Sequence, residues 1–270
     1  MKLCVFGNPI QQSRSPDIHH HFASLCGINV SYDKCLAPLD GFEPTVRRFI
    51  ALGGKGANVT VPFKEEALAL CSHLSERAKA AGAVNTLSII DGEIHGDNTD
   101  GAGLVNDLLS KGVKLENARI LLIGAGGAAR GVVLPILAQQ PESITIINRT
   151  VTKAESLVAQ FNNARLVAGG LDIPVIEPFD LVINATSASL SDTTVELPKG
   201  VIATHTTCYD MVYGRDKTAF MRYCEQMGAN QTYDGLGMLV GQAAESFYIW
   251  TGIKPDVKTT LDFVRNMLVQ

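Results

Sequence analysis

Residues 119–140, RILLIGAGGAARGVVLPILAQQ, contain the glycine pattern that decides the fold of this chain. A run of isoleucine and leucine leads straight into the glycines, and a helix-forming stretch follows. Gly124 permits a tight turn, Gly126 lets the backbone approach a pyrophosphate, and the small Ala129 lets the helix pack on the strand. The free amides of the helix N-terminus favour an anion. The pattern predicts a dinucleotide site, contacted by Gly124, Ala125, Gly126, Gly127 and Ala128; the alternative is a glycine turn needed only for packing.

The end of the next strand indicates which dinucleotide binds. An NAD site places an acidic residue about 20 residues after the glycines, where it accepts hydrogen bonds from the ribose 2′-hydroxyl. Here the strand ends in Asn148-Arg149-Thr150, and Lys153 follows one helical turn later. A guanidinium and an ammonium suit a 2′-phosphate, so these four residues predict NADP. In the alternative interpretation, Arg149 and Lys153 only begin a solvated helix.

Apolar runs alternate with amphipathic stretches on both sides of the glycine pattern, as in repeated βα units with a largely parallel sheet. The ranges expected to form strands are 3–7, 31–37, 56–61, 143–150 and 180–186. The ranges expected to form helices are 16–27, 42–54, 63–71, 100–112, 153–161, 242–252 and 258–270. Asp91-Gly92 lies between two alternating runs and predicts a tight hairpin, which adds an antiparallel element to the first sheet.

The strand–helix alternation restarts near residue 102 and ends near residue 235, which divides the chain. At 270 residues the chain is long enough for two domains of ordinary size. The predicted fold class is α/β with two domains. Residues 1–102 and 236–270 form a mostly parallel substrate-binding domain completed by C-terminal helices, and residues 103–235 form a Rossmann domain that binds NADP.

Composition excludes several classes of partner. The net charge is −4 with scattered lysines and arginines, so no basic field attracts nucleic acid or anionic lipid. The N-terminal sequence lacks a signal-peptide pattern and no apolar run could span a bilayer, so we expect a cytoplasmic protein without membrane contact. No cysteine spacing suits a metal, and the consecutive His19, His20 and His21 cannot face one ion on a helix. We expect no metal site.

A set of strings in the order of the chain closely resembles the shikimate dehydrogenase family, over nearly the whole length. They are GNPIQQSRSPDIHHHF, GKGANVTVPFKEEA, AGAVNT, GDNTDG, IGAGGAAR, NRT, NATS, YDM and DGLGMLVGQAA. The resemblance implies the reversible, NADPH-dependent reduction of 3-dehydroshikimate to shikimate in the chorismate pathway to aromatic amino acids. Ordered agreement of many motifs is far more specific than any single string.

The resemblance also implies a substrate site. Ser13 and Ser15 match the serines that bind the substrate carboxylate. The further substrate contacts that it implies are Thr60, Lys64, Asn85, Asp100, Tyr213 and Gln242. Shikimate is a small ring with a carboxylate and hydroxyls, so hydroxyl and amide groups around one proton-transfer group suit it.

Lys64 and Asp100 match the catalytic pair of the family. Hydride arriving at a carbonyl carbon leaves negative charge on the oxygen, and an ammonium can both stabilise and protonate that oxygen. Asp100 can hold the ammonium in place and bind the neighbouring hydroxyl. The sequence leaves open which of the two is the principal base. Without the resemblance, both would be read as exposed charges.

Four residues of the second domain complete the implied cofactor site. Thr186 and Ser187 follow a strand, where ribose or nicotinamide is contacted, and Met211 and Gly235 match residues against the nicotinamide. For Met211, plain core packing is an equal alternative.

This chain departs from the family in two places. Gln12 stands where the family commonly has histidine, and Ser189 and Leu190 stand where it usually has glycine. The Gln12 amide can still donate a hydrogen bond, whereas Ser189 and Leu190 can alter the backbone near the nicotinamide and with it cofactor affinity. The stretch THTTC at 204–208 is also more polar than the resemblance leads us to expect.

Three other functions compete with this prediction. A dual quinate and shikimate dehydrogenase would use NAD as well, which Arg149 disfavours. A non-catalytic NADP-binding module would not need Lys64 and Asp100. A folate-type methylene dehydrogenase is disfavoured by the SRSP and DGLGM strings. The expected partners are the small-molecule substrate and NADP, and both a monomer and a homodimer fit the sequence.

Overall fold

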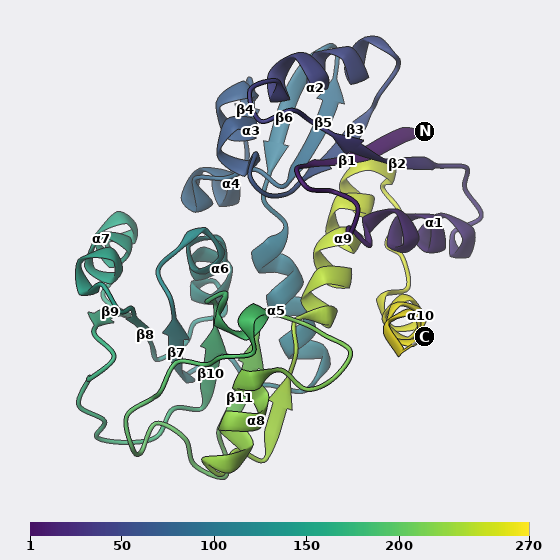
Figure 1. Cartoon of the computed structure of the whole chain (residues 1–270). Coiled ribbons are helices and arrows are strands. Elements are labelled where there is room, and N and C mark those ends of the chain that lie inside the picture. The colour runs from purple at the N-terminus through teal and green to yellow at the C-terminus, as the bar shows by residue number, and fades with distance from the viewer. Residues whose placement is uncertain (270) are drawn as a thin grey trace. The chain divides into compact units, whose positions relative to one another are not determined.

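The computed structural model describes residues 1–269, which fold into two compact units. Unit 1 comprises Met1–Gly103 and Leu239–Leu268, and unit 2 comprises Leu104–Met238. Each unit is an α/β structure with its own six-stranded sheet (Figure 1). Both boundaries fall inside helices, in α5 (Asp100–Ser110) and α9 (Leu236–Thr251).

The sheet of unit 1 has the strand order β2-β1-β3-β5-β6-β4. Its strands are β1 (Lys2–Gly7), β2 (Ser31–Leu36), β3 (Gly56–Val59), β4 (His73–Leu74), β5 (Thr86–Ile90) and β6 (Glu93–Asp97). β1 pairs in parallel with β2 and β3, whereas β5 is antiparallel to both β3 and β6. Asp91 and Gly92 have φ values of 51° and 83°, as the tight turn of a hairpin requires. The predicted antiparallel hairpin is therefore confirmed.

Helices pack on both faces of this sheet. The helices of unit 1 are α1 (Ser15–Leu25), α2 (Phe42–Ala51), α3 (Lys64–Leu70), α4 (Glu76–Ala81), the N-terminal part of α5, α9 and α10 (Val257–Val269). On one face, Phe42 and Phe49 of α2 pack edge-on against Phe6 of β1. On the other face, aromatic residues of α1 meet α9, where Phe22 lies 5.5 Å from Phe247. Helix α9, from the C-terminal part of the chain, thus completes the core of unit 1.

The sheet of unit 2 is parallel throughout, with the order β12-β11-β10-β7-β8-β9. Its strands are β7 (Arg119–Ile123), β8 (Ser143–Ile147), β9 (Leu166–Gly169), β10 (Leu181–Asn184), β11 (Thr207–Asp210) and β12 (Gln231–Tyr233). Its helices are the C-terminal part of α5, α6 (Gly127–Leu137), α7 (Val151–Phe161), α8 (Ala219–Gln226) and the 3-10 helix η1 (Ala188–Ser191). The predicted α/β fold class is confirmed in both units.

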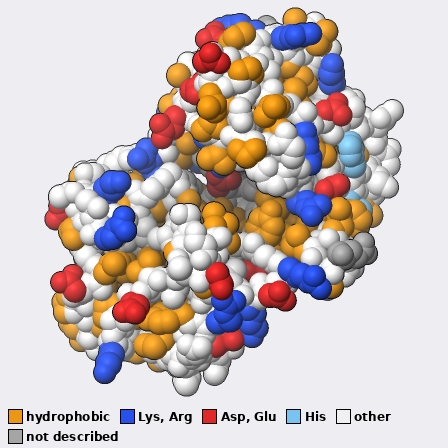
Figure 2. All heavy atoms as spheres, in the orientation of Figure 1, with side chains coloured by type: hydrophobic (Ala, Val, Ile, Leu, Met, Phe, Trp, Pro, Cys, Tyr) orange, Lys and Arg blue, Asp and Glu red, His pale blue; other side chains and the backbone are white. Residues whose placement is uncertain are grey.

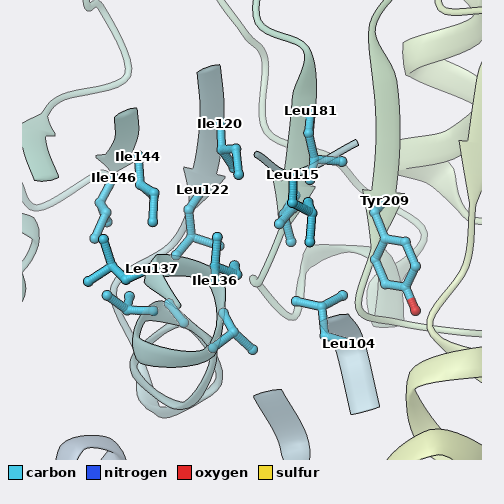
Figure 3. Close-up of a cluster of buried hydrophobic side chains, with 14 of the residues drawn as sticks. Leu104, Leu115, Ile120, Leu122, Ile136, Leu137, Ile144, Ile146, Leu181 and Tyr209 are labelled. Carbon is cyan, nitrogen blue, oxygen red and sulfur yellow. The ribbon is translucent and has the colours of Figure 1, made fainter. Parts of the chain in front are cut away.

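Alternate residues of the central strands of unit 2 form two cores. Ile120 and Leu122 of β7 face one core with Ile144 of β8 and Ile136 of α6 (Figure 3). Leu121 belongs to the second core, on the other face of the sheet. Burial on both faces explains why β7 reads as a nearly continuous apolar run.

The surface agrees with the scattered charge of the sequence. On the face drawn in Figure 2, lysines and arginines are interspersed with acidic, apolar and polar side chains. Within residues 1–269, no helix is both long enough and apolar enough to cross a lipid bilayer. The histidine run lies on α1, where His19 is buried, His20 exposed and His21 half-buried.

The packing of α9 on β3 gives a stability prediction. A Cβ added to Gly56 would lie 2.4 Å from Nε1 of Trp250, which donates a hydrogen bond to the Leu87 carbonyl at 2.9 Å. We expect Gly56→Ala to lower the free energy of unfolding by about 1–3 kcal/mol, because overpacking displaces the indole. Urea denaturation measures the change. Gly127→Ala is the control, since its Cβ would meet no atom within 4 Å; equal losses in both variants would contradict the prediction.

Candidate active site

Strand direction places six of the predicted substrate residues at one end of the strands of unit 1. β1 and β3 finish at this end of the sheet, and the segments after them carry Ser13, Ser15, Thr60 and Lys64. β5 runs the opposite way and therefore begins there, directly after Asn85. β6 ends there, three residues before Asp100.

Lys64 and Asp100 form a charged pair at this end of the sheet. Lys64 Nζ donates to Asp100 Oδ2 at 2.6 Å, in a charge-assisted hydrogen bond. Each residue is the first of its helix, Lys64 of α3 and Asp100 of α5. The side chains are 32% and 19% exposed, so the pair is held by the protein yet open to a ligand.

Asn85 fixes the carboxylate of Asp100 from the other side. Its amide Nδ2 donates to Asp100 Oδ1 at 2.8 Å and to Gln242 Oε1 at 3.3 Å. The Gln242 amide in turn donates to the Leu239 carbonyl at 2.9 Å. The structure thus brings four predicted residues, from α3, α5, α9 and the start of β5, into one polar cluster.

The other predicted substrate residues at this end of the sheet carry hydroxyl groups. Ser13 Oγ and Ser15 Oγ are hydrogen-bonded at 3.2 Å. The Thr60 backbone is held by the Phe6 carbonyl at 2.9 Å, and its half-buried side chain forms no hydrogen bond with any described residue. Tyr213 belongs to unit 2, where it is half-buried after β11.

Unit 2 contains a cavity of about 590 Å³ at the carboxyl ends of β7, β8 and β10. Its lining includes eleven residues that the sequence singled out: Gly124, Ala125, Gly126, Gly127, Ala128, Asn148, Arg149, Thr150, Lys153, Thr186 and Ser187. The sequence did not single out the apolar part of the lining, which includes Ile123, Leu171 and Val195. Carboxyl strand ends at a glycine turn are where doubly wound sheets bind nucleotides.

The backbone at the glycine turn fits a dinucleotide. Gly124 has φ +106°, a conformation that favours glycine, and a Cβ there would crowd Thr186 at 3.2 Å. A Cβ at Gly126 or Gly127 would meet nothing within 4 Å, so the space in front of them is open. No side chain caps the N-terminus of α6, which leaves its first amides available for a phosphate.

The cationic residues of the cavity are available for a ligand. Arg149 and Lys153 are exposed, and neither side chain forms an ion pair within residues 1–269. No carboxylate appears among the described residues that line the cavity. These charges suit a 2′-phosphate rather than a free ribose hydroxyl.

Met211 and Gly235 are not among the residues that line this cavity, but they contact each other. A Cβ on Gly235 would lie 2.2 Å from the Met211 carbonyl oxygen, so only glycine fits there. The Met211 amide donates to the Asn184 carbonyl at 3.0 Å, and its half-buried side chain packs against the core. Core packing is thus one real role of Met211.

Comparison with known proteins gives the family. The sequence matches the Shikimate dehydrogenase substrate binding domain over residues 5–87, the Shikimate / quinate 5-dehydrogenase domain over 107–208 and the Shikimate 5'-dehydrogenase C-terminal domain over 235–262. It is 53% identical over 264 residues to a protein of Colwellia psychrerythraea named shikimate dehydrogenase (NADP(+)), covering 98% of this chain and 96% of that one. The chain belongs to the shikimate dehydrogenase family. The family resemblance predicted from the motifs is confirmed.

Solved structures agree with this membership. The crystal structure of an Ael1 enzyme from Pseudomonas putida has a TM-score of 0.94 at 40% identity, covering 100% of this chain and 98% of that one. A shikimate 5-dehydrogenase of Thermus thermophilus, solved in complex with NADP(H) and shikimate, has a TM-score of 0.87 at 30% identity, covering 99% and 100%. The similarity extends over the whole chain of this family member.

A buried carboxylate, Asp210, organises the wall of the cofactor cavity, a role that the YDM string did not predict. Asp210 is fully buried at the end of β11. Its Oδ1 accepts hydrogen bonds from Asn184 Nδ2 at 3.0 Å and from the Val212 amide at 3.1 Å. Its Oδ2 accepts from the hydroxyls of Ser189 and Thr218, both at 2.6 Å.

The same network reaches Thr186. Asn184 Oδ1 accepts from the Thr186 hydroxyl at 2.7 Å and from the Thr186 amide at 3.1 Å. Asp210 therefore fixes the cavity residue Thr186 through Asn184, and fixes the turn η1 through Ser189. A buried acceptor beside several short polar side chains in one βα loop is the signal that could have revealed it.

Both departures from the family pattern now have structural partners. Ser189, in place of the usual glycine, ties η1 to Asp210. Gln12, in place of histidine, is exposed, and its amide donates to the Pro9 carbonyl at 3.3 Å. The Ser189 departure thus adds a contact that a glycine cannot make.

We expect Ser189→Gly to loosen the wall of the cofactor cavity. Loss of one hydrogen bond to a charged group lowers the free energy of unfolding by about 1–2 kcal/mol, and the freer turn raises KM for NADPH a few-fold at unchanged kcat. Denaturation and steady-state kinetics measure the two effects. Ser191→Gly is the matched control, because Ser191 is exposed in the same turn. If both variants behaved alike, the Asp210 contact would be irrelevant to binding.

Proposed function

We propose that this family member catalyses the reversible, NADPH-dependent reduction of 3-dehydroshikimate to shikimate, a step of the chorismate pathway to aromatic amino acids. The observation that carries the proposal is the 2.6 Å contact of Lys64 with Asp100, within a polar cluster at one end of the strands of unit 1. The relative from Colwellia psychrerythraea carries the name of this activity, and the similar Thermus thermophilus structure holds NADP(H) and shikimate.

The substrate is held by the polar groups of unit 1. Ser13 and Ser15 bind the carboxylate through their paired hydroxyls, and Thr60 offers a further one. Asn85 and Gln242 contact the ring substituents, and Tyr213, which belongs to unit 2, is a further predicted contact. Several fixed donors and acceptors around a small ring select its orientation, which places the carbonyl at the charged pair.

Lys64 and Asp100 handle the proton. NADPH, when bound, supplies the hydride to the carbonyl carbon. The Lys64 ammonium stabilises the charge that grows on the carbonyl oxygen and transfers a proton to it, leaving a neutral amine and a hydroxyl. In the reverse direction the neutral amine accepts that proton. Asp100 holds the amine and accepts a hydrogen bond from the neighbouring ring hydroxyl.

The cofactor is held by unit 2. The amides after Gly124 bind the pyrophosphate, and Arg149 and Lys153 bind the 2′-phosphate beside Asn148 and Thr150. Thr186 contacts the nicotinamide end of the cofactor, with Met211 and Gly235 against the ring. Two observations support this assignment of the cofactor site: the space in front of Gly126 and Gly127 is open, and the cations Arg149 and Lys153 line the same cavity.

The cell compartment and the oligomeric state stay predictions. We place the protein in the cytoplasm, and its six free cysteines fit a reducing compartment. Both a monomer and a homodimer fit the proposal.

We expect Lys64→Ala to lower kcat by about 10²–10⁴-fold, because the alkoxide loses both its stabilising charge and its proton donor. Absorbance of the reduced nicotinamide with shikimate and NADP gives the rate, and circular dichroism verifies the fold. Lys55→Ala is the matched control: Lys55 is exposed immediately before β3 of the same sheet, and its removal leaves the rate unchanged. Full turnover by Lys64→Ala would remove this residue from the mechanism.

Rates with shikimate and quinate, each with NADP and NAD, separate the proposal from its rivals. We expect shikimate with NADP to be fastest, and Arg149→Ala to raise KM for NADP about 10- to 100-fold with little change for NAD. Arg165→Ala, an exposed arginine of the same unit outside the cavity, is the control. Comparable rates with quinate and NAD would indicate the dual enzyme, and no nicotinamide turnover would indicate a binding module.

A further inference from the structure

Two histidines and a glutamate gather at the far edge of the sheet of unit 1, outside the residues assigned to the reaction. They are His73, Glu93 and His95, and their potential ligand atoms all lie within 4.8 Å of one another. Imidazole nitrogens and a carboxylate oxygen are the ligands that zinc and neighbouring transition metals bind in proteins. The cluster therefore has the chemistry of a metal site.

The pairing of β4 with β6 brings these residues together. In their parallel register, His73 of β4 lies opposite His95 of β6. Glu93 lies two residues before His95, so both project from the same face of β6, because strand side chains alternate. Ile94, between them, projects to the other face and is buried in the core. The backbone thus fixes all three side chains on one side of a sheet edge.

The distances suit an ion after small side-chain rotations. His73 Nε2 lies 2.6 Å from Glu93 Oε2, and the rings of His73 and His95 stack with centroids 4.4 Å apart. Metal–ligand distances of about 2.0–2.1 Å around tetrahedral zinc place ligand atoms about 3.3 Å apart. The side chains of His73 and Glu93 are 55% and 57% exposed, which gives them room to rotate without a backbone shift.

We propose that His73, Glu93 and His95 bind one divalent transition-metal ion of the zinc class, with its remaining coordination positions open to water. The ion clamps the two-residue edge strand β4 to β6 and stabilises unit 1. It replaces the direct hydrogen bond between His73 and Glu93 and takes no part in hydride transfer. The sequence predicted no metal site, because these ligands are 20 and two residues apart along the chain and fit no metal-binding spacing.

Calorimetric titration of the full, chelator-treated chain with zinc chloride tests the proposal. We expect one equivalent to bind, and His95→Ala and Glu93→Gln each to weaken binding tenfold or more. Glu93→Gln keeps the shape of the side chain and therefore guards against misfolding. Magnesium chloride, which prefers an all-oxygen site, is expected not to bind.

The matched control is His205→Ala in unit 2. His205 is an exposed histidine with Nε2 3.9 Å from Asp180, so it has a carboxylate partner but no second histidine. This variant is expected to keep the full equivalent of zinc. If His205→Ala lost the binding instead, or if the double variant His73→Ala, His95→Ala kept it, the proposed site would be wrong.

Two further measurements assign the ligands. Thermal unfolding is expected to shift upward with zinc in the wild-type chain and not in the double variant, since an ion that binds only the folded state stabilises it. Cobalt(II) in place of zinc is expected to give visible bands of nitrogen and oxygen coordination. A thiolate charge-transfer band would assign the metal to the free cysteines and overturn the proposal, as would the absence of any zinc binding.

Discussion

The buried polar network centred on Asn85 is the constraint on which unit 1 depends. Asn85 Oδ1 accepts from the Thr99 amide at 2.9 Å, while Nδ2 holds Asp100. The neighbouring Thr86 hydroxyl lies 2.7 Å from Ser246 Oγ of α9. Buried polar groups are costly unless they are paired. The sheet, the start of α5 and helix α9 must therefore pack together for these groups to find their partners. The candidate active-site pair therefore owes its geometry to the fold.

The same network extends to the histidine run on α1. Asn58 Oδ1 accepts from Tyr32 at 2.6 Å and contacts His19 Nε2 at 3.1 Å. Burial lowers the pKa of His19 from 6.5 to about 3, which keeps the imidazole neutral. Because the folded pKa is depressed, the unfolded chain binds the proton more readily below pH 6.5. The stability that neutral His19 supplies is therefore present above that pH and is lost as the pH falls toward 3.

The sequence predicted β7 and β8 but missed β4, β9, β11 and β12. β7 reads as a strand because isoleucine and leucine fill both of its faces, and β8 reads as one because Ile144 and Ile146 alternate with Ser143 and Thr145. β11 begins inside the polar stretch THTTC. Just before the strand, Thr206 is buried, donates to the Phe179 carbonyl at 2.7 Å and accepts from the Ala203 amide. Its hydroxyl replaces backbone partners at a turn, which no periodicity reveals. The two-residue β4 is too short for any pattern.

For the proposed site, residue type and motif order indicated the members, whereas the proposed division of labour between them rests on tertiary contacts. Asp100 already accepts one hydrogen bond on each carboxylate oxygen, from Lys64 and from Asn85. An ammonium carries three donors, and the hydrogen bond to Asp100 uses one of the three on Lys64. The lysine side chain is also the more exposed of the two, at 32% against 19%. A donor with free hydrogens, held by a carboxylate that is already hydrogen-bonded on both oxygens, favours Lys64 as the group that exchanges the proton and Asp100 as the group that positions it.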